Sequence, residues 1–99
     1  MRMRLAVLPL FAATGCLTNT ISGRWTGCDP GDQVYVRIPN DAADHFECER
    51  GGFELEAGVQ GDFQIELERE SGVDGHWINT VTIQLHDVNG DTDIGVVAL

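Results

Sequence analysis

Apolar and polar residues alternate along most of the chain, and this period of two constrains the fold more than any other feature. In residues 33–38, for example, Val34, Val36 and Ile38 are separated by Tyr35 and Arg37. Successive side chains of a strand point to opposite faces, so such a run buries one face and leaves the other in water. No apolar pattern of helical period competes with it. Similar runs occupy residues 45–48, 53–57, 63–68, 81–86 and 94–98, and residues 24–27 are expected to form a first strand.

Clusters of turn-forming residues separate these runs. The pair Asn89-Gly90, between two alternating runs, is typical of a tight hairpin because both central residues need a positive φ. About seven short strands, with turns every 8–12 residues or so, predict an all-β fold. We expect a small antiparallel β-sandwich, with a small barrel as the alternative. The other clusters lie at residues 29–32, 39–41, 51–52, 58–62 and 71–75.

The N-terminal segment resembles the signal peptide of bacterial lipoproteins. Residues 1–4 carry two arginines, residues 5–13 are apolar, and Ala13-Thr14-Gly15-Cys16 places small residues before a cysteine, as a lipobox does. The resemblance implies cleavage before Cys16, which would then carry diacylglyceryl and palmitate chains. Two or more acyl chains hold a protein stably at a membrane, whereas the apolar run is far shorter than the ~20 residues of a spanning helix.

Two details qualify this resemblance. Ala13 stands where the lipobox usually has leucine, and an ordinary secretory signal followed by a coincidental cysteine is the alternative. The residue after the cysteine is Leu17 rather than aspartate, which by the same resemblance implies the outer membrane of a didermic bacterium. The chain would then divide into a signal peptide over residues 1–15, a lipidated tether over 16–23 and a β-sandwich domain over 24–99.

If Cys16 carries lipid, two of the three cysteines remain, Cys28 and Cys48. Small exported domains often contain disulfides because their compartment is oxidising. We therefore predict a Cys28–Cys48 disulfide, which would stabilise the fold by roughly 3 kcal/mol in the chain-entropy model. Two free thiols are the alternative.

Three segments of the domain resemble small immunoglobulin- or prealbumin-like β-sandwich modules of predicted bacterial surface lipoproteins. They are Trp25 to Val36, with Cys28 before a Gly-Asp-Gln-Val strand, Phe46 to Leu55, with Cys48 after an aromatic residue, and Gly61 to Leu67. The resemblance covers about half of the chain and supports the fold and the disulfide. It implies no common enzymatic activity.

The charge of the chain excludes one class of partner. The formal net charge is −10, and it would fall to −12 without Arg2 and Arg4. Phosphate contacts need a basic surface, so we expect no nucleic-acid partner. An anionic membrane would repel such a domain, so attachment to the membrane would depend on the N-terminal lipid.

One segment resembles a calcium-binding loop. Asp87, Asn89, Asp91 and Asp93 place oxygen-bearing side chains at every second position, which suits a hard cation. The glycine and the bidentate carboxylate of the usual motif are missing, since Thr92 and Ala98 stand there. A polar turn without metal is therefore the favoured interpretation, and weak calcium binding is the alternative.

No catalytic set stands out elsewhere. The three histidines, His45, His76 and His86, are not at metal-binding spacing, and neither serine suggests a nucleophile. Trp25 is expected to pack near the disulfide, whereas Trp77 is either a core cap or an exposed partner-binding residue. Five glutamates on alternating runs are interpreted as solvated faces rather than an acid/base or metal-binding ladder: Glu54, Glu56, Glu66, Glu68 and Glu70.

These observations lead to one functional expectation and one alternative. We expect a non-enzymatic lipoprotein of the cell envelope, without a cofactor, that serves interaction or structure. The alternative is a weak calcium- or ligand-binding β module that uses the segment from Asp87 to Asp93.

Overall fold

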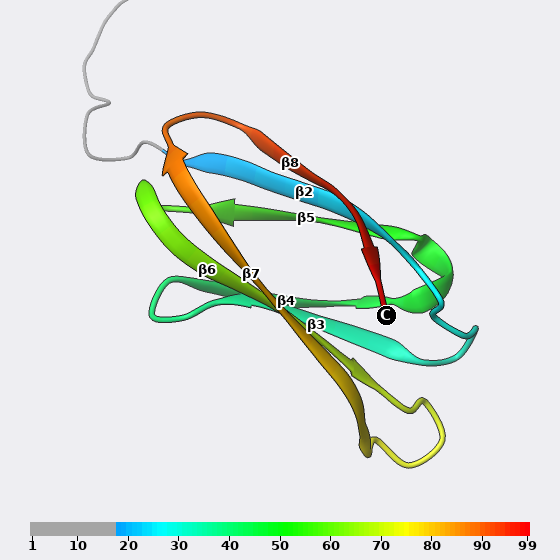
Figure 1. The fold of residues 1–99 in the computed structure, drawn as a ribbon. Helices are drawn as coiled ribbons and strands as arrows, with labels where there is room; N and C mark the ends of the chain where they lie inside the picture. Colours follow the sequence, from blue (N-terminus) through cyan, green and yellow to red (C-terminus); the bar gives the residue numbers. More distant parts are fainter. Residues whose placement is uncertain (1–17) are drawn as a thin grey trace, which may run out of the picture.

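The computed structural model describes residues 18–99, which form two β-sheets packed face to face (Figure 1). One sheet has three strands in the order β5-β2-β8, and the other has four in the order β4-β3-β6-β7. The predicted small all-β sandwich is therefore confirmed. The elements are β2 (Asn19–Thr26), β3 (Gln33–Ile38), β4 (Ala42–Glu47), the 3-10 helix η1 (Cys48–Arg50), β5 (Gly52–Ala57), β6 (Gly61–Glu70), β7 (Trp77–Val88) and β8 (Thr92–Ala98).

The core lies between the sheets and follows the alternation of the sequence. On β3, Val34, Val36 and Ile38 are buried, while Tyr35 and Arg37 between them are exposed. The inner faces of β2 and β6 are filled in the same way, and burial of these side chains supplies the main driving force for folding. The largest side chains without solvent contact are Ile21, Val34, Val36, Ile65 and Leu67.

Strand β2 begins earlier than predicted. Residues 19–23 belong to it, so the expected tether over residues 16–23 is wrong for this part. Asn19 pairs with Ala57 of β5, and Ile21 is completely buried. The signal in the sequence was weak, because Ile21 is the only large apolar residue between Thr18 and Arg24. Long-range pairing with β5, rather than local pattern, extends this strand.

The predicted hairpin at Asn89-Gly90 is also wrong. Strands β7 and β8 lie in different sheets, and β8 pairs in parallel with β2. Neither Asn89 nor Gly90 has a positive φ, whereas Asp87 does, with φ 54°. The connection is therefore a crossover that carries the chain from one sheet to the other. The two true hairpins join β3 to β4, where Asn40 has φ 64°, and β6 to β7.

Strands that follow one another in the sequence often lie in different sheets. β2 and β3 lie in opposite sheets, and β2 pairs antiparallel with β5 and parallel with β8. Between β2 and β8 the chain passes from one sheet to the other four times, as is common in two-layer sandwiches with Greek-key connections.

A glycine substitution tests the close pairing of β2 and β5. A Cβ atom at Gly52 would lie 2.5 Å from the carbonyl oxygen of Gly23, so Gly52→Ala forces the backbones apart. We expect the free energy of unfolding to fall by about 1–3 kcal/mol, as for other overpacked sites. Chemical denaturation measures it. Gly90→Ala is the control, since no atom lies within 4 Å of its Cβ position, and an equal loss there would contradict the explanation.

Candidate functional site

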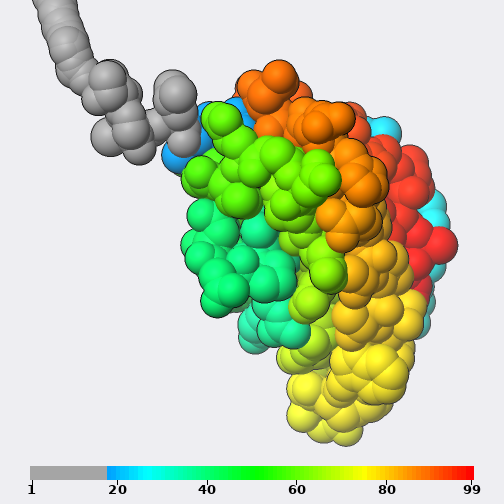
Figure 2. All heavy atoms as spheres, turned by 60° about the vertical axis from the view of Figure 1, so that its left-hand side comes forward, coloured from blue at the N-terminus to red at the C-terminus, as the bar shows by residue number. Residues whose placement is uncertain are grey.

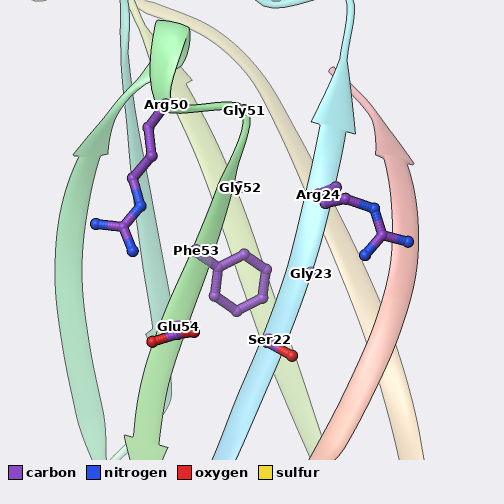
Figure 3. Close-up of a pocket in the computed structure, with 8 residues that line it drawn as sticks. All are labelled: Ser22, Gly23, Arg24, Arg50, Gly51, Gly52, Phe53 and Glu54. Carbon is purple, nitrogen blue, oxygen red and sulfur yellow. The ribbon is translucent and has the colours of Figure 1, made fainter.

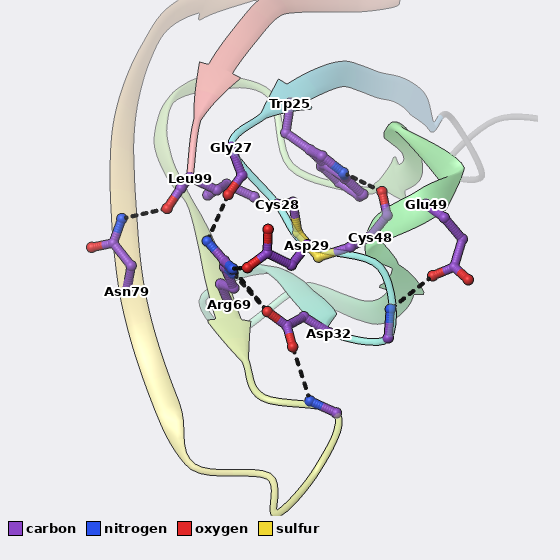
Figure 4. Close-up of a disulfide and its surroundings, with 12 residues drawn as sticks. Trp25, Gly27, Cys28, Asp29, Asp32, Cys48, Glu49, Arg69, Asn79 and Leu99 are labelled. Atoms are coloured by element: carbon purple, nitrogen blue, oxygen red, sulfur yellow. Dashed lines mark hydrogen bonds and ion pairs between the residues drawn. A yellow bond between two sulfur atoms is a disulfide. The ribbon is translucent and has the colours of Figure 1, made fainter.

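The two cysteines of the predicted disulfide lie at bonding distance, with their Cα atoms 5.5 Å apart (Figure 4). Cys28 follows β2 of one sheet, and Cys48 follows β4 of the other. The pair therefore links the two sheets at one end of the sandwich. Cys16, the predicted lipid attachment site, lies outside the described residues.

Arg69 of β6 joins the cysteine-bearing loop to the four-stranded sheet. Its guanidinium donates hydrogen bonds to the carbonyl oxygen of Gly27 at 2.7 Å, to Asp29 at 3.0 Å and to Asp32 at 2.8 and 3.1 Å (Figure 4). Only 11% of this side chain is exposed. A buried charge is costly unless it is paired and hydrogen-bonded, and this one is both. We call Arg69, Asp29, Asp32 and the two cysteines the end clamp.

Trp25 completes this end of the core. Its side chain is buried, and its indole Nε1 donates a 2.9 Å hydrogen bond to the carbonyl oxygen of Cys48. Its ring lies nearly parallel to that of Phe53, with centroids 6.3 Å apart. The prediction that Trp25 packs near the disulfide is confirmed.

Asp32 receives bonds from two elements. One carboxylate oxygen accepts from Arg69, and the other accepts from the backbone N–H of Gly72 at 3.2 Å. The Arg69 hydrogen bonds, followed by the bond from Gly72, lower the pKa of Asp32 below its ordinary value. This carboxylate therefore holds the start of the β6–β7 hairpin against the loop after β2.

The structure does not bring the four candidate calcium ligands together. Asp91 accepts a hydrogen bond from the backbone N–H of Thr20 at 2.9 Å. Asp93 accepts from the backbone N–H of Gly95 at 2.8 Å and pairs with Arg24 at 3.3 Å. These carboxylates stabilise the crossover and β8, and within residues 18–99 no three His, Cys, Asp or Glu side chains converge as metal ligands.

The five glutamates do not form one ladder. Glu54 and Glu56 lie on β5, whereas Glu66, Glu68 and Glu70 lie on β6 of the other sheet. On β6, Arg37 of the neighbouring strand pairs with Glu66 at 2.8 Å and with Glu68 at 3.7 Å. The glutamates thus occupy the outer faces of two different sheets.

The histidines are likewise dispersed. His45 stacks on Tyr35, His76 contacts Asp74 in the β6–β7 hairpin, and His86 lies exposed on β7. Each has a separate environment, so they do not form a common site.

A shallow cavity of about 370 Å³ opens over β2 and β5, and sequence reasoning missed it (Figure 3). Gly51 and Gly52 contribute no side chains to its lining, whereas a side chain at Gly23 would point into the core against Ile94 and Phe53. The two arginines at its sides point elsewhere: Arg24 pairs with Asp93, and Arg50 lies over the ring of Phe46 at 5.1 Å. In the sequence, the Gly51-Gly52 pair is the feature that could indicate this cavity, although such a pair by itself predicts only a turn. The lining residues are Ser22, Gly23, Arg24, Arg50, Gly51, Gly52, Phe53 and Glu54.

Large apolar side chains are exposed at the β6–β7 hairpin. Val73 at its tip is 95% exposed, and Trp77, the first residue of β7, is 60% exposed. Figure 2 shows this hairpin, in yellow, extending from the lower end of the molecule. Trp77 is therefore exposed and does not cap the core.

Comparison with known proteins gives no family for this chain: it matches no family model and no curated protein. Across residues 18–99, no helix has the length and apolar character needed to cross a membrane.

The bonds of Asp32 predict a pH-dependent loss of stability. Because the folded-state pKa is lowered, the contribution of Asp32 is complete above the unfolded-state pKa of about 3.9 and is lost as the pH falls through the folded-state pKa. We expect Asp32→Asn to lower Tm at pH 7, and the difference from wild type to shrink below about pH 4. Thermal melts across this range measure it. Glu56→Gln, on an exposed outer face, is the control, and a pH-independent difference for Asp32→Asn would contradict the assignment.

Proposed function

We propose that this chain is a non-enzymatic, lipid-anchored protein of the cell envelope that presents a rigid β-sandwich for interaction with a protein partner. The short distance in sequence between Cys16 and the domain supports this proposal. Strand β2 begins at Asn19, only three residues after the lipobox cysteine. The expected localisation remains the outer membrane of a didermic bacterium.

The position of β2 determines which end of the domain would face the membrane. Three residues span only about 10 Å even when fully extended. The end that holds the start of β2 would thus lie close to the lipid surface. Ala57 and Gly61 are at this same end, because Ala57 pairs with Asn19 and a short loop connects it to Gly61.

The opposite end would face away from the membrane. Strand β6 runs from Gly61 to Glu70, which carries the chain roughly 30 Å from the anchored end. The end clamp and the β6–β7 hairpin lie there, with Trp77 exposed. Exposed aromatic residues are common energetic centres of protein interfaces, so this end suits a partner.

The cysteine pair and the charge fit this location. A Cys28–Cys48 disulfide would persist in the oxidising envelope. The acidic domain would be repelled by an anionic lipid surface, so the lipid on Cys16 would have to supply the attachment. The calcium-binding alternative gains no support, because Asp91 and Asp93 already use their carboxylates within the fold.

Removal of the cysteine tests the anchor. In a didermic host, we expect the wild-type chain to remain with the membranes after washing with high salt, and Cys16→Ser to move to the soluble fraction. The loss should be nearly complete, since without acyl chains only a repelled acidic domain remains. Fractionation followed by immunoblotting measures it. Thr18→Ser is the matched control and should stay with the membranes. A soluble wild-type chain, or a membrane-bound Cys16→Ser variant, would show that the proposal is wrong.

A further inference from the structure

Strand β7 has one edge that pairs with no other strand of residues 18–99. It is the longest strand, with 12 residues, and it pairs only with β6 among residues 18–99 (Figure 1). The register with β6 is regular from Asn79 to Leu85 and shifts only toward the two ends of β6. Along this stretch the backbone therefore presents free N–H and C=O groups, which are a template for another strand.

This edge carries no charge over nine residues. The stretch Trp77 to Leu85 reads W-I-N-T-V-T-I-Q-L, with no acidic or basic side chain, no glycine and no proline. The whole chain, by contrast, has 16 acidic residues and a net charge of −10. Two copies of so acidic a protein repel each other over most of their surface. The edge of β7 is therefore a place where two copies can approach without opposing carboxylates.

The other edge strands are protected in ways that β7 is not. Charged side chains and bulges are the usual means by which edges avoid pairing. Strand β4 carries Asp44 and Glu47, and β5 carries Glu54 and Glu56. Strand β8 is irregular: Gly95 has φ 84° and the register with β2 shifts. Among the edge strands of residues 18–99, β7 is therefore the least protected against pairing with another strand.

The inner side of β7 is also incompletely covered. Val81, Ile83 and Leu85 pack against the core but remain only half-buried. The corresponding residues of β6 in the middle of the sheet, Ile65 and Leu67, are fully buried. A strand added beside β7 would extend the sheet and cover this apolar row.

We propose that a second copy of this chain pairs with the edge of β7, antiparallel and in a register centred on Ile83. In this register Ile83 lies opposite Ile83 of the second copy, and Val81 lies opposite Leu85, so that apolar side chains meet on the inner face. On the outer face Thr82 lies opposite Gln84. A two-fold arrangement of this kind uses the same surface on both copies, and the two four-stranded sheets become one.

The proposal does not depend on the lipid anchor. It uses only the β7 edge and the charge distribution, and would hold for the domain in any compartment. The antiparallel strands place the anchored ends of the two copies at opposite ends of the dimer, so copies anchored as proposed above pair only when they are held at two facing membrane surfaces.

The test is sedimentation equilibrium of the full chain in density-matched detergent, where we expect a monomer–dimer equilibrium. The double variant Thr82→Lys/Gln84→Lys places like charges opposite each other twice in the proposed register, and should weaken dimerisation at least tenfold. It lowers the net negative charge, so general repulsion cannot explain a loss. Thr26→Lys/Gln60→Lys makes the same change of charge at exposed sites outside the proposed Val81–Leu85 contact and should dimerise like wild type.

A second pair of variants tests the register. Thr82→Glu/Gln84→Glu alone should also be monomeric, and mixing it with the lysine variant should restore a heterodimer through two Lys–Glu pairs. Circular dichroism checks that each variant is folded. The proposal is overturned if the wild type stays monomeric at every concentration. This holds even if the wild type is found to bind a different protein. It is also overturned if the lysine variant dimerises as tightly as its control, or if the mixture does not associate.

Discussion

The end clamp connects the two sheets of this small sandwich at the end where Cys28, Cys48 and Arg69 lie. Two sheets of short strands share a core in which only five large side chains are completely free of solvent contact. The pair Cys28 and Cys48 ties the sheets together, and Arg69 ties β6 to the loop after β2. Because such a small domain buries a limited part of its surface, these cross-connections matter more than they would in a larger protein.

The clamp also explains how the β6–β7 hairpin can extend so far. Asp32 accepts bonds from both Arg69 and the backbone of Gly72, so the base of the hairpin is fixed to the body of the sandwich. Beyond that point the hairpin exposes Val73 and Trp77, and β7 continues as a long edge that no other strand in the described part of the chain pairs with. An exposed edge on a rigid base suits the interaction proposed above.

The alternation of apolar and polar residues predicts individual strands, because it depends only on neighbouring residues. Alternation located β3, β5 and β6, and Trp25 lies beside Cys48 as expected. Local alternation does not predict strands whose position depends on long-range pairing. β2 starts at Asn19, where it pairs with β5, and β8 pairs with the edge of β2 rather than with β7. The oxygen-rich spacing from Asp87 to Asp93 could not reveal that Thr20 and Arg24, some 70 residues away, use two of these carboxylates. The cavity over Gly52 and the role of Arg69 depend on the same long-range contacts.

We propose that the clamped sandwich is held at a membrane by lipid on Cys16, three positions before β2. The most direct measurement is the intact mass of the full chain, expressed in a didermic bacterium and extracted from its membranes. We expect a species that starts at Cys16, carries two or three acyl chains, and is two hydrogens lighter than its reduced form because Cys28 and Cys48 are joined. A species that retains residues 1–15, or one with an unmodified Cys16, would contradict it.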